Sequence, residues 1–545
     1  MQDQIRGLRR GKDRYAMSMK ARTAQLNKRQ KDALFYASLL ALALVIFVFA
    51  GSREPVLFDD SGSYVSMKRR EGVMPLYPLF LFLNQILFGL GRYLRAVIVE
   101  QAVITAVCTV LFVREIKERF ALRYREGYFI FLLALLPYTT ELPAAMITQT
   151  ILTEALAYAL FYLLLILYLR AVWRNSYGYL AGSFMMVFLL SMLRSQLQIL
   201  FVVCGVLFLY LLWKRCDTKL KKLGGAAAGL LGCAAVSMAG VWLTAAVLNQ
   251  YNVLMKENMA INLFIMKIQE PVYYQEFLVS ETGQSRQPEE MEEAVRDVRA
   301  EMASQGGNIA LSQYTSLILS RGMYEADEDD VELYRDEMVR GLFRTIYQAA
   351  DGKEQRYVYE ERGLWMWKDI VGGIGSVGWT CVTAGSSYFQ ENYPEIYMAD
   401  NFNEIWNRSL QTIGTGLLQK HFGRFLYHTL MMLPQAFICT VFFQIKPIYL
   451  LCHLATLFLY CSALALMIWG YADKKIPNAY AECMALVLGS NIVMVIVISL
   501  IFFGQQRYLV YNFGFFYIAY YLLLRELYIR YVREKIIKWN EKKKY

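Results

Sequence analysis

Long runs of apolar residues, separated by shorter polar segments, recur along this chain in two groups. Each run is close to the roughly 20 residues that an α-helix needs to cross the hydrocarbon core of a bilayer. Lipid offers the backbone no hydrogen-bond partners, so each run is predicted to be a helix. The ten predicted spans are residues 33–51, 93–113, 127–144, 152–172, 177–193, 196–213, 224–247, 448–470, 482–503 and 510–529.

Two further apolar segments are predicted to lie along the membrane surface. Residues 76–91, LYPLFLFLNQILFGLG, are too short to span, follow Pro75 and end in glycines. Residues 424–443 are long enough, but an eleventh span would place the basic segments that follow it on the outer side. Both are therefore predicted to be interfacial helices with their apolar faces in the lipid boundary.

Lysine and arginine predict the orientation of the spans. With ten spans, every strongly basic connection falls on the same side of the membrane as the basic N-terminus, which is the pattern of cytoplasmic segments. The chain is therefore predicted to be an integral plasma-membrane protein with both termini in the cytoplasm. The basic segments are the leader 1–32, REIKERFALRYR (114–125), LRAVWRN (169–175), WKRCDTKLKK (213–222), YADKK (471–475) and the tail 530–545.

The fold class that follows is an all-α polytopic membrane protein with a large outer segment. That segment is predicted to be mainly helical, because apolar positions recur with helical spacing in PEEMEEAVRDVRAEM and EADEDDVELYRDEMVRGLFRTIYQAA. The predicted parts are a cytoplasmic leader (1–32), an N-terminal membrane module (33–247) with its first outer loop at 52–92, an extracytoplasmic loop domain (248–447), C-terminal spans (448–529) and a cytoplasmic tail (530–545).

The amino-acid composition is that of a protein whose main partner is a lipid bilayer. Of 545 residues, 57% are hydrophobic, whereas soluble domains are usually about 45–50% apolar. The net charge of +11 lies in short runs beside the apolar segments, as topology determinants do, so nucleic acid is not a predicted partner. Nine cysteines without a CxxC pair argue against a structural zinc site or a disulfide framework.

The candidate chemistry begins in the first outer loop, with FDDSGSY at residues 58–64. A carboxylate of Asp59 or Asp60 held at the membrane surface could accept a proton from an attacking hydroxyl. The pair could also hold a divalent ion, Mg²⁺ or Mn²⁺, against a phosphate. The alternative is that both acids only cap a helix beginning at Ser61, where negative charge suits the helix dipole. These interpretations are compatible.

Further ionisable residues are predicted at the same membrane face. Glu100, Glu141 and Glu154 lie in or beside the outer ends of spans, and charges inside a span usually face a cavity or a partner. Arg194, Arg507 and the run 68–70 (Lys-Arg-Arg) are candidate cations for a phosphate group. The competing interpretations are that the acids merely reach interfacial water and that the cations snorkel to lipid headgroups.

The segments DDSGSY, PLYPLF, LFG, VEQAV and ILTEALAYALFYLLLILY together resemble the C-type (GT-C) membrane glycosyltransferases, whose members include protein O-mannosyltransferases and aminoarabinose transferases of lipid A. The resemblance covers residues 33–215 and, more weakly, the last span. It implies a GT-C-like helix bundle, a catalytic acid in the first outer loop and a polyprenyl-phosphate sugar as donor. One departure is Met74-Pro75, where a His-Pro or Pro-Pro pair is frequent.

Residue by residue, the resemblance implies Asp60 as the catalytic acid, with Asp59 as the alternate and Glu154 as a second acidic residue. It also implies roles in binding substrate or phosphate for a wider set of residues, and a glycan, lipid or protein as acceptor in cell-envelope glycan biosynthesis. The predicted binding residues are Tyr64, Tyr77, Glu100, Arg194 and Arg507.

Two other functions remain open from the sequence. A transporter or flippase of lipid-linked saccharides would use the same substrate class, but such proteins often have inverted repeats and broken helices near the midplane. A glycan polymerase would place its chemistry in a later loop. An essential acid in the first outer loop favours the transferase, whereas essential arginines further along favour the polymerase.

Overall fold

The computed structural model describes thirteen stretches of the chain. Among the predicted features that lie outside them are Asp59, the run 68–70, Glu141 and nearly all of the 248–447 domain. The described residues are 27–49, 54–58, 60–66, 73–140, 145–215, 231–232, 234–240, 242–243, 387–397, 422–442, 449–473, 476–501 and 506–533. They form two compact units, one of Met1–Val253, Cys461–Ser490 and Val510–Tyr545, the other of Leu254–Tyr460 and Asn491–Leu509.

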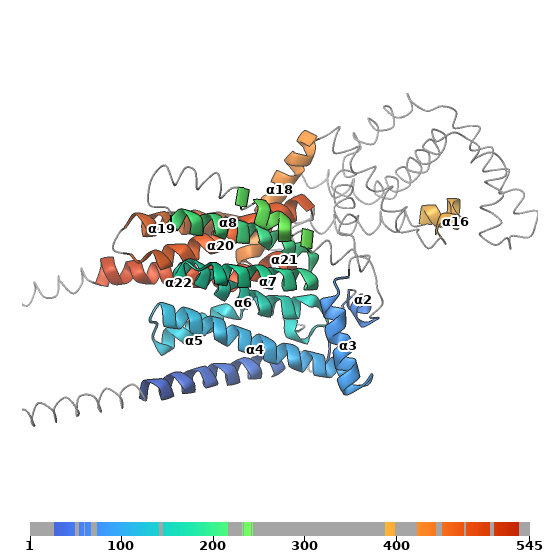
Figure 1. Ribbon diagram of the computed structural model, residues 1–545, viewed down its shortest axis with the longest axis horizontal. Helices are drawn as coiled ribbons and strands as arrows, with labels where there is room; N and C mark the ends of the chain where they lie inside the picture. Colours follow the sequence, from blue (N-terminus) through green and yellow to red (C-terminus); the bar gives the residue numbers. More distant parts are fainter. Residues whose placement is uncertain are drawn as a thin grey trace, which may run out of the picture. The chain divides into compact units, whose positions relative to one another are not determined.

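Within the described residues the structure is helical, and its only β-pairing is an isolated parallel bridge between Val56 and Thr150. The first unit contains the following helices (Figure 1): Asn27–Phe49, α2 (Ser61–Val65), α3 (Leu76–Phe88), α4 (Tyr93–Arg119), α5 (Tyr124–Ala134), α6 (Thr153–Arg174), α7 (Tyr177–Leu193), α8 (Leu200–Arg215), the start of α20 (Asn478–Ile501) and α22 (Phe513–Leu527). Short 3₁₀ turns connect several of them, among them η1 (Leu136–Thr139), η2 (Ile147–Gln149) and η3 (Ser195–Ile199).

The prediction of a multi-pass membrane protein is confirmed. Six helices among the described residues are long and apolar enough to cross a bilayer: Asn27–Phe49, Tyr93–Arg119, Thr153–Arg174, Ser195–Arg215, Leu451–Ala472 and Asn478–Leu500. They coincide with six of the ten predicted spans. The full count of ten, and the separate outer domain, stay predictions.

Two of the other predicted spans are shorter as helices than the apolar runs that predict them. Residues 127–144 do not form one helix, because α5 ends at Ala134 and Pro137 lies in the 3₁₀ turn that follows. Proline lacks the backbone N–H that would continue the helix. Helix α22 has 15 residues, fewer than the predicted span 510–529, whereas α7 has the bounds of the predicted span 177–193. The predicted span 224–247 lies mostly outside the described residues.

Helix α6 is the most buried of the six long apolar helices, and it packs against α4 and α7. The ring of Tyr162 on α6 stacks on Phe112 of α4, with centroids 4.6 Å apart. Gly514 of α22 approaches this layer so closely that a Cβ there would lie 2.5 Å from the carbonyl oxygen of Leu133. A residue without a side chain is therefore required where α22 meets α5.

The second unit is described by shorter pieces. They include α16 (Pro394–Tyr397), α18 (Phe422–Val441), the start of α19 (Tyr449–Ala472) and α21 (Gln506–Leu509). Helix α18 confirms a helix over most of 424–443, and it packs against α21. The Tyr460 hydroxyl bonds to Thr440 at 2.6 Å and accepts from Asn491 at 2.9 Å. The interfacial position of α18 stays a prediction.

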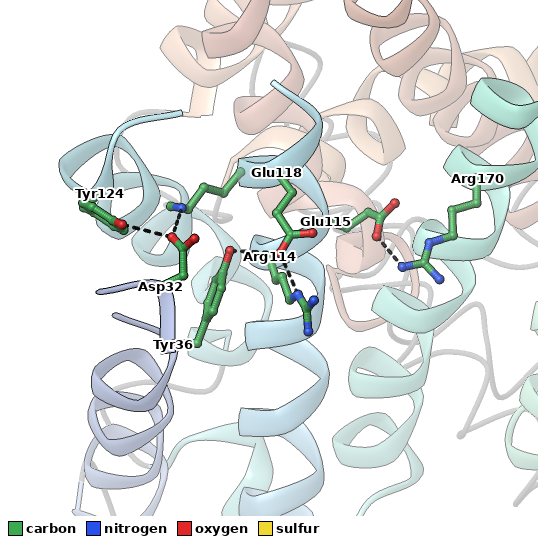
Figure 2. A network of polar contacts seen from close by, with 8 residues as sticks. Asp32, Tyr36, Arg114, Glu115, Glu118, Tyr124 and Arg170 are labelled. Atoms are coloured by element: carbon green, nitrogen blue, oxygen red, sulfur yellow. Dashed lines mark hydrogen bonds and ion pairs between the residues drawn. The ribbon is translucent and has the colours of Figure 1, made fainter. Parts of the chain in front are cut away.

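Ion pairs connect the basic ends of several first-unit helices near the C-terminal end of α4 (Figure 2). Lys117 Nζ lies 3.1 Å from Asp32 Oδ1 of the first helix, and Arg170 of α6 pairs with Glu115 of α4. Arg525 at the end of α22 pairs with Glu126 in the first turn of α5. Lys214 of α8 lies 2.9 Å from Glu482 of α20. The basic segments of these helices therefore share one end of the first unit, as the alternation of charge predicts.

Candidate functional site

The opposite end of α4 meets the first outer loop, where α2 and α3 lie (Figure 1). The loop is tied by its backbone to the segment before α6. Val56 N–H donates to the Gln149 carbonyl at 2.9 Å, and Ile151 N–H donates to the Val56 carbonyl at 3.0 Å. Ser61 Oγ accepts from Phe58 N–H and donates to the Ile151 carbonyl, both at 2.9 Å. The start of α2 is thereby fixed beside the start of α6.

The helix predicted to begin at Ser61 is confirmed, and Asp60 is its N-cap residue. Its carboxylate makes no side-chain capping bond. An N-cap side chain normally accepts a hydrogen bond from the second or third N–H of its helix. The capping interpretation is thus not supported for Asp60, and Ser61 makes the contacts that hold the turn instead. Asp59 lies outside the described residues.

Glu154 and Arg194, predicted separately, form an ion pair. Glu154 is in the first turn of α6, and Arg194 follows α7 in an extended conformation that ends the helix. Their side chains are 2% and 10% exposed, so both charges are removed from bulk solvent. Thr153 Oγ1 donates to Glu154 Oε2 at 3.1 Å. Such burial is tolerated because each charge has the other as its partner, and Glu154 also accepts the hydrogen bond from Thr153.

Tyr64 of α2 lies next to this pair. Burial raises the pKa of its phenol, and the negative charges of Glu154 and Asp60 add to the effect. The positive charge of Arg194 and a hydrogen bond with the Thr153 side chain act in the opposite direction. The charged groups that act on the Tyr64 phenol are three of the predicted site residues, Glu154, Arg194 and Asp60.

Tyr77 of α3 completes the arrangement. Its ring meets the ring of Tyr64 edge-on, with centroids 5.3 Å apart and an interplanar angle of 85°. Its side chain is fully buried, and its hydroxyl donates to Gln101 Oε1 at 2.8 Å. We call Asp60, Tyr64, Tyr77, Thr153, Glu154 and Arg194 the Glu154–Arg194 cluster. All six residues belong to the first unit.

Gln101 is a supporting residue that the sequence analysis did not single out. Its Nε2 donates to the carbonyl oxygens of Thr148 at 3.0 Å and Thr150 at 3.1 Å, while its Oε1 accepts from Tyr77. One buried amide thus joins α4, α3 and the segment before α6. The available signal was an uncharged polar residue inside a predicted span, directly after Glu100.

Two other predicted residues have different surroundings. Glu100 Oε2 accepts from Asn84 Nδ2 of α3 at 2.9 Å, which holds α3 against α4. Arg507 belongs to the second unit, where its Nη2 donates to the Tyr508 hydroxyl at 3.0 Å. Its predicted role beside the first-unit residues stays a prediction.

The cluster offers two carboxylates, phenolic hydroxyls and a guanidinium within one polar region. Among the described residues, no group of three His, Cys, Asp or Glu side chains is placed to hold a metal ion. A metal site built on Asp60 would need Asp59, which the structure does not describe, or oxygens of a phosphate ligand. Magnesium or manganese as a cofactor therefore stays a prediction.

Comparisons with protein-family models, with curated proteins and with solved structures find no match to this chain. The resemblance to the GT-C transferases accordingly remains an expectation from short motifs. Arguments about function rest on the chemistry of the cluster.

Proposed function

We propose that this protein is a membrane glycosyltransferase that moves a sugar from a polyprenyl-phosphate donor to an acceptor at the outer face of the membrane. One observation carries the proposal. Asp60, Tyr64, Glu154 and Arg194 come from three separate segments of the chain, and they meet at one end of the helix bundle. Replacing a buried ion pair by apolar residues is often neutral or stabilising, so the presence of the Glu154–Arg194 pair favours a functional role. Ionisable groups at membrane depth commonly mark substrate sites.

In the proposed reaction Asp60 acts on the acceptor. Its carboxylate takes the proton of the acceptor hydroxyl as that oxygen forms a bond to the anomeric carbon of the donor sugar. The bond from the anomeric carbon to the phosphate oxygen breaks, and its electron pair leaves with the phosphate. Arg194 stabilises the negative charge that develops there.

Glu154 has a positioning role in this scheme. A guanidinium has five N–H donors in a fixed plane, so Arg194 can keep its contact with Glu154 and still donate to a phosphate oxygen. Glu154 fixes the direction of that plane, and Thr153 in turn bonds to Glu154. The half-buried Tyr64 supplies aromatic surface and a hydroxyl beside Asp60 against which a sugar ring can lie, and the buried ring of Tyr77 supports it edge-on.

The test uses the full-length protein in liposomes, labelled polyprenyl-phosphate sugars and a crude envelope fraction as acceptor. Wild type is run beside Asp60→Asn, Asp59→Asn and the double variant, each with Mg²⁺, with Mn²⁺ and with a chelator. Glu54→Gln is the matched control, because Glu54 is an exposed carboxylate of the same loop, paired with Arg95. Loss of a general base should lower the transfer rate by about 10²–10⁴-fold in Asp60→Asn, with Glu54→Gln close to wild type.

Label that reaches the acceptor and stops only when Asp60 is changed would support the transferase and its base. Intact donor in every assay, or a double variant as fast as wild type, would contradict the proposal. Movement of unreacted lipid-linked saccharide across the membrane would then favour the transport alternative.

A further inference from the structure

The turn that follows Arg194 contains two buried amide groups without hydrogen-bond partners. These are Nε2 of Gln196 and Nε2 of Gln198, and neither atom has a partner among the described residues. The Gln198 side chain is deeply buried, with the residue only 7% exposed. A buried donor left unsatisfied is destabilising, and nearly all buried polar groups in folded proteins have a partner. Two such donors in one short turn therefore need an explanation.

The position of the two glutamines in the chain supports a functional explanation. Both glutamines lie in η3, a 3₁₀ turn of five residues between the apolar helices α7 and α8. Runs of 3₁₀ helix longer than three or four residues are uncommon, although shorter 3₁₀ turns are frequent connectors between helices. At a rise of about 2 Å per residue, the Cα atoms of both glutamines lie within roughly 10 Å of the Arg194 Cα. The amide groups are thus close in the chain to the buried cation of the cluster.

We propose that Gln196 and Gln198 bind phosphate oxygens together with Arg194, so that residues 194–198 form a phosphate subsite. An amide NH₂ group only donates, and therefore requires a ligand with acceptor atoms. The guanidinium beside it selects an anion among such ligands, and phosphate is the anion whose several oxygens accept from a guanidinium and from amides at once. The assignment of this phosphate to a polyprenyl donor rests on the proposed function, whereas the subsite itself does not.

Binding is measured on the full-length protein in nanodiscs of uncharged phosphatidylcholine, with farnesyl monophosphate as the probe. Farnesol tests the prenyl chain alone, and inorganic phosphate tests the anion alone. The variants are Gln196→Leu and Gln198→Leu, which remove the donors without adding charge, and Gln198→Glu, which replaces a donor with an anion. Gln85→Leu is the matched control, a half-buried amide on α3 outside the cluster. Melting temperatures close to wild type verify that each variant is folded.

We expect each leucine variant to raise the Kd for farnesyl monophosphate about tenfold, as the loss of a hydrogen bond to a charged group should. Gln198→Glu should raise it further, and farnesol binding and Gln85→Leu should stay unchanged. If inorganic phosphate competes with farnesyl monophosphate, the subsite binds the free anion. If it does not compete, the subsite binds the phosphate only when a lipid carries it. Unchanged affinity in all three variants, or an equal loss of farnesol binding, would overturn the subsite.

These results separate the two proposals. A phosphate affinity that depends on the glutamines, without sugar transfer under any condition, would leave the subsite standing and remove the transferase. Sugar transfer that depends on Asp60, with phosphate affinity untouched by the glutamine variants, would do the reverse.

Discussion

At the scale of single residues, each charge of the Glu154–Arg194 pair is buried because the other is present. Removing only one partner leaves an uncompensated charge in the interior, which costs about 3–5 kcal/mol. We therefore expect Glu154→Gln to lower the free energy of unfolding by about that amount. The double variant Glu154→Gln with Arg194→Met should recover much of the loss, since no buried charge remains. Unfolding in detergent, followed by tryptophan fluorescence, measures both effects.

The matched control is Glu118→Gln, which removes an exposed carboxylate paired with Arg114 four residues away. Exposed pairs of this kind contribute less than about 1 kcal/mol. If Glu154→Gln were no more destabilising than Glu118→Gln, the buried ion pair would not have the energetic role assigned to it.

The sequence predicted Glu154 and Arg194 as site residues but not as partners. Forty residues and a whole helix separate them in the chain, and no local pattern encodes which charges on different helices will meet. Gln101 and the two glutamines of η3 were missed for a related reason. An uncharged amide in an apolar run carries no electrostatic signal, and its importance depends on which carbonyls or ligands its neighbours present.

At the scale of elements, the first helix is attached to α4 and α5 by a buried cation (Figure 2). Lys117 Nζ bonds to Asp32 and lies 4.6 Å from the ring centroid of Tyr124 and 5.3 Å from that of Phe35. A desolvated cation–π contact is worth about 2 kcal/mol, and the Asp32 bond adds to it. We expect Lys117→Met to loosen the first helix by about 2 kcal/mol or more, and so to speed amide hydrogen exchange in residues 27–36.

Arg119→Gln tests whether that effect is specific. Arg119 is an exposed cation near the same end of α4, but its guanidinium lies over the ring of Trp173 on α6 and not over a residue of the first helix. Hydrogen exchange in the first helix should stay at the wild-type rate in this variant. Equal acceleration in both variants would show that any loss of charge near the helix end loosens it, and that the aromatic surroundings of Lys117 are not decisive.

The ends of elements were the least predictable part of the fold. The predicted span begins at residue 33, but residues 27–32 are already helical in the described chain, and Asp32 in that stretch pairs with Lys117. The apolar run at 127–144 suggested a span, but α5 ends at Ala134, ahead of Pro137. Hydropathy identifies apolar segments, whereas helix ends depend on caps, prolines and tertiary partners.

At the scale of the whole molecule, the first unit is electrically polarised along α4. This helix of 27 residues is about 40 Å long at 1.5 Å per residue. Its C-terminal end meets the ion pairs of the basic segments, and its N-terminal end meets the first outer loop with Asp60. An excess of positive charge at one end is the arrangement that orients membrane proteins. The sequence predicted this separation because it depends on the order of segments rather than on individual contacts.

The orientation can be tested with one exposed position at each end of the unit. Ser66 follows α2, and Arg125 lies in the first turn of α5. In intact cells we expect a membrane-impermeant maleimide to label Ser66→Cys, and to label Arg125→Cys only after the membrane is permeabilised. The unchanged protein, with its nine cysteines, gives the background. The opposite result would place Asp60 and the Glu154–Arg194 cluster on the cytoplasmic side, where an acceptor outside the cell could not reach them.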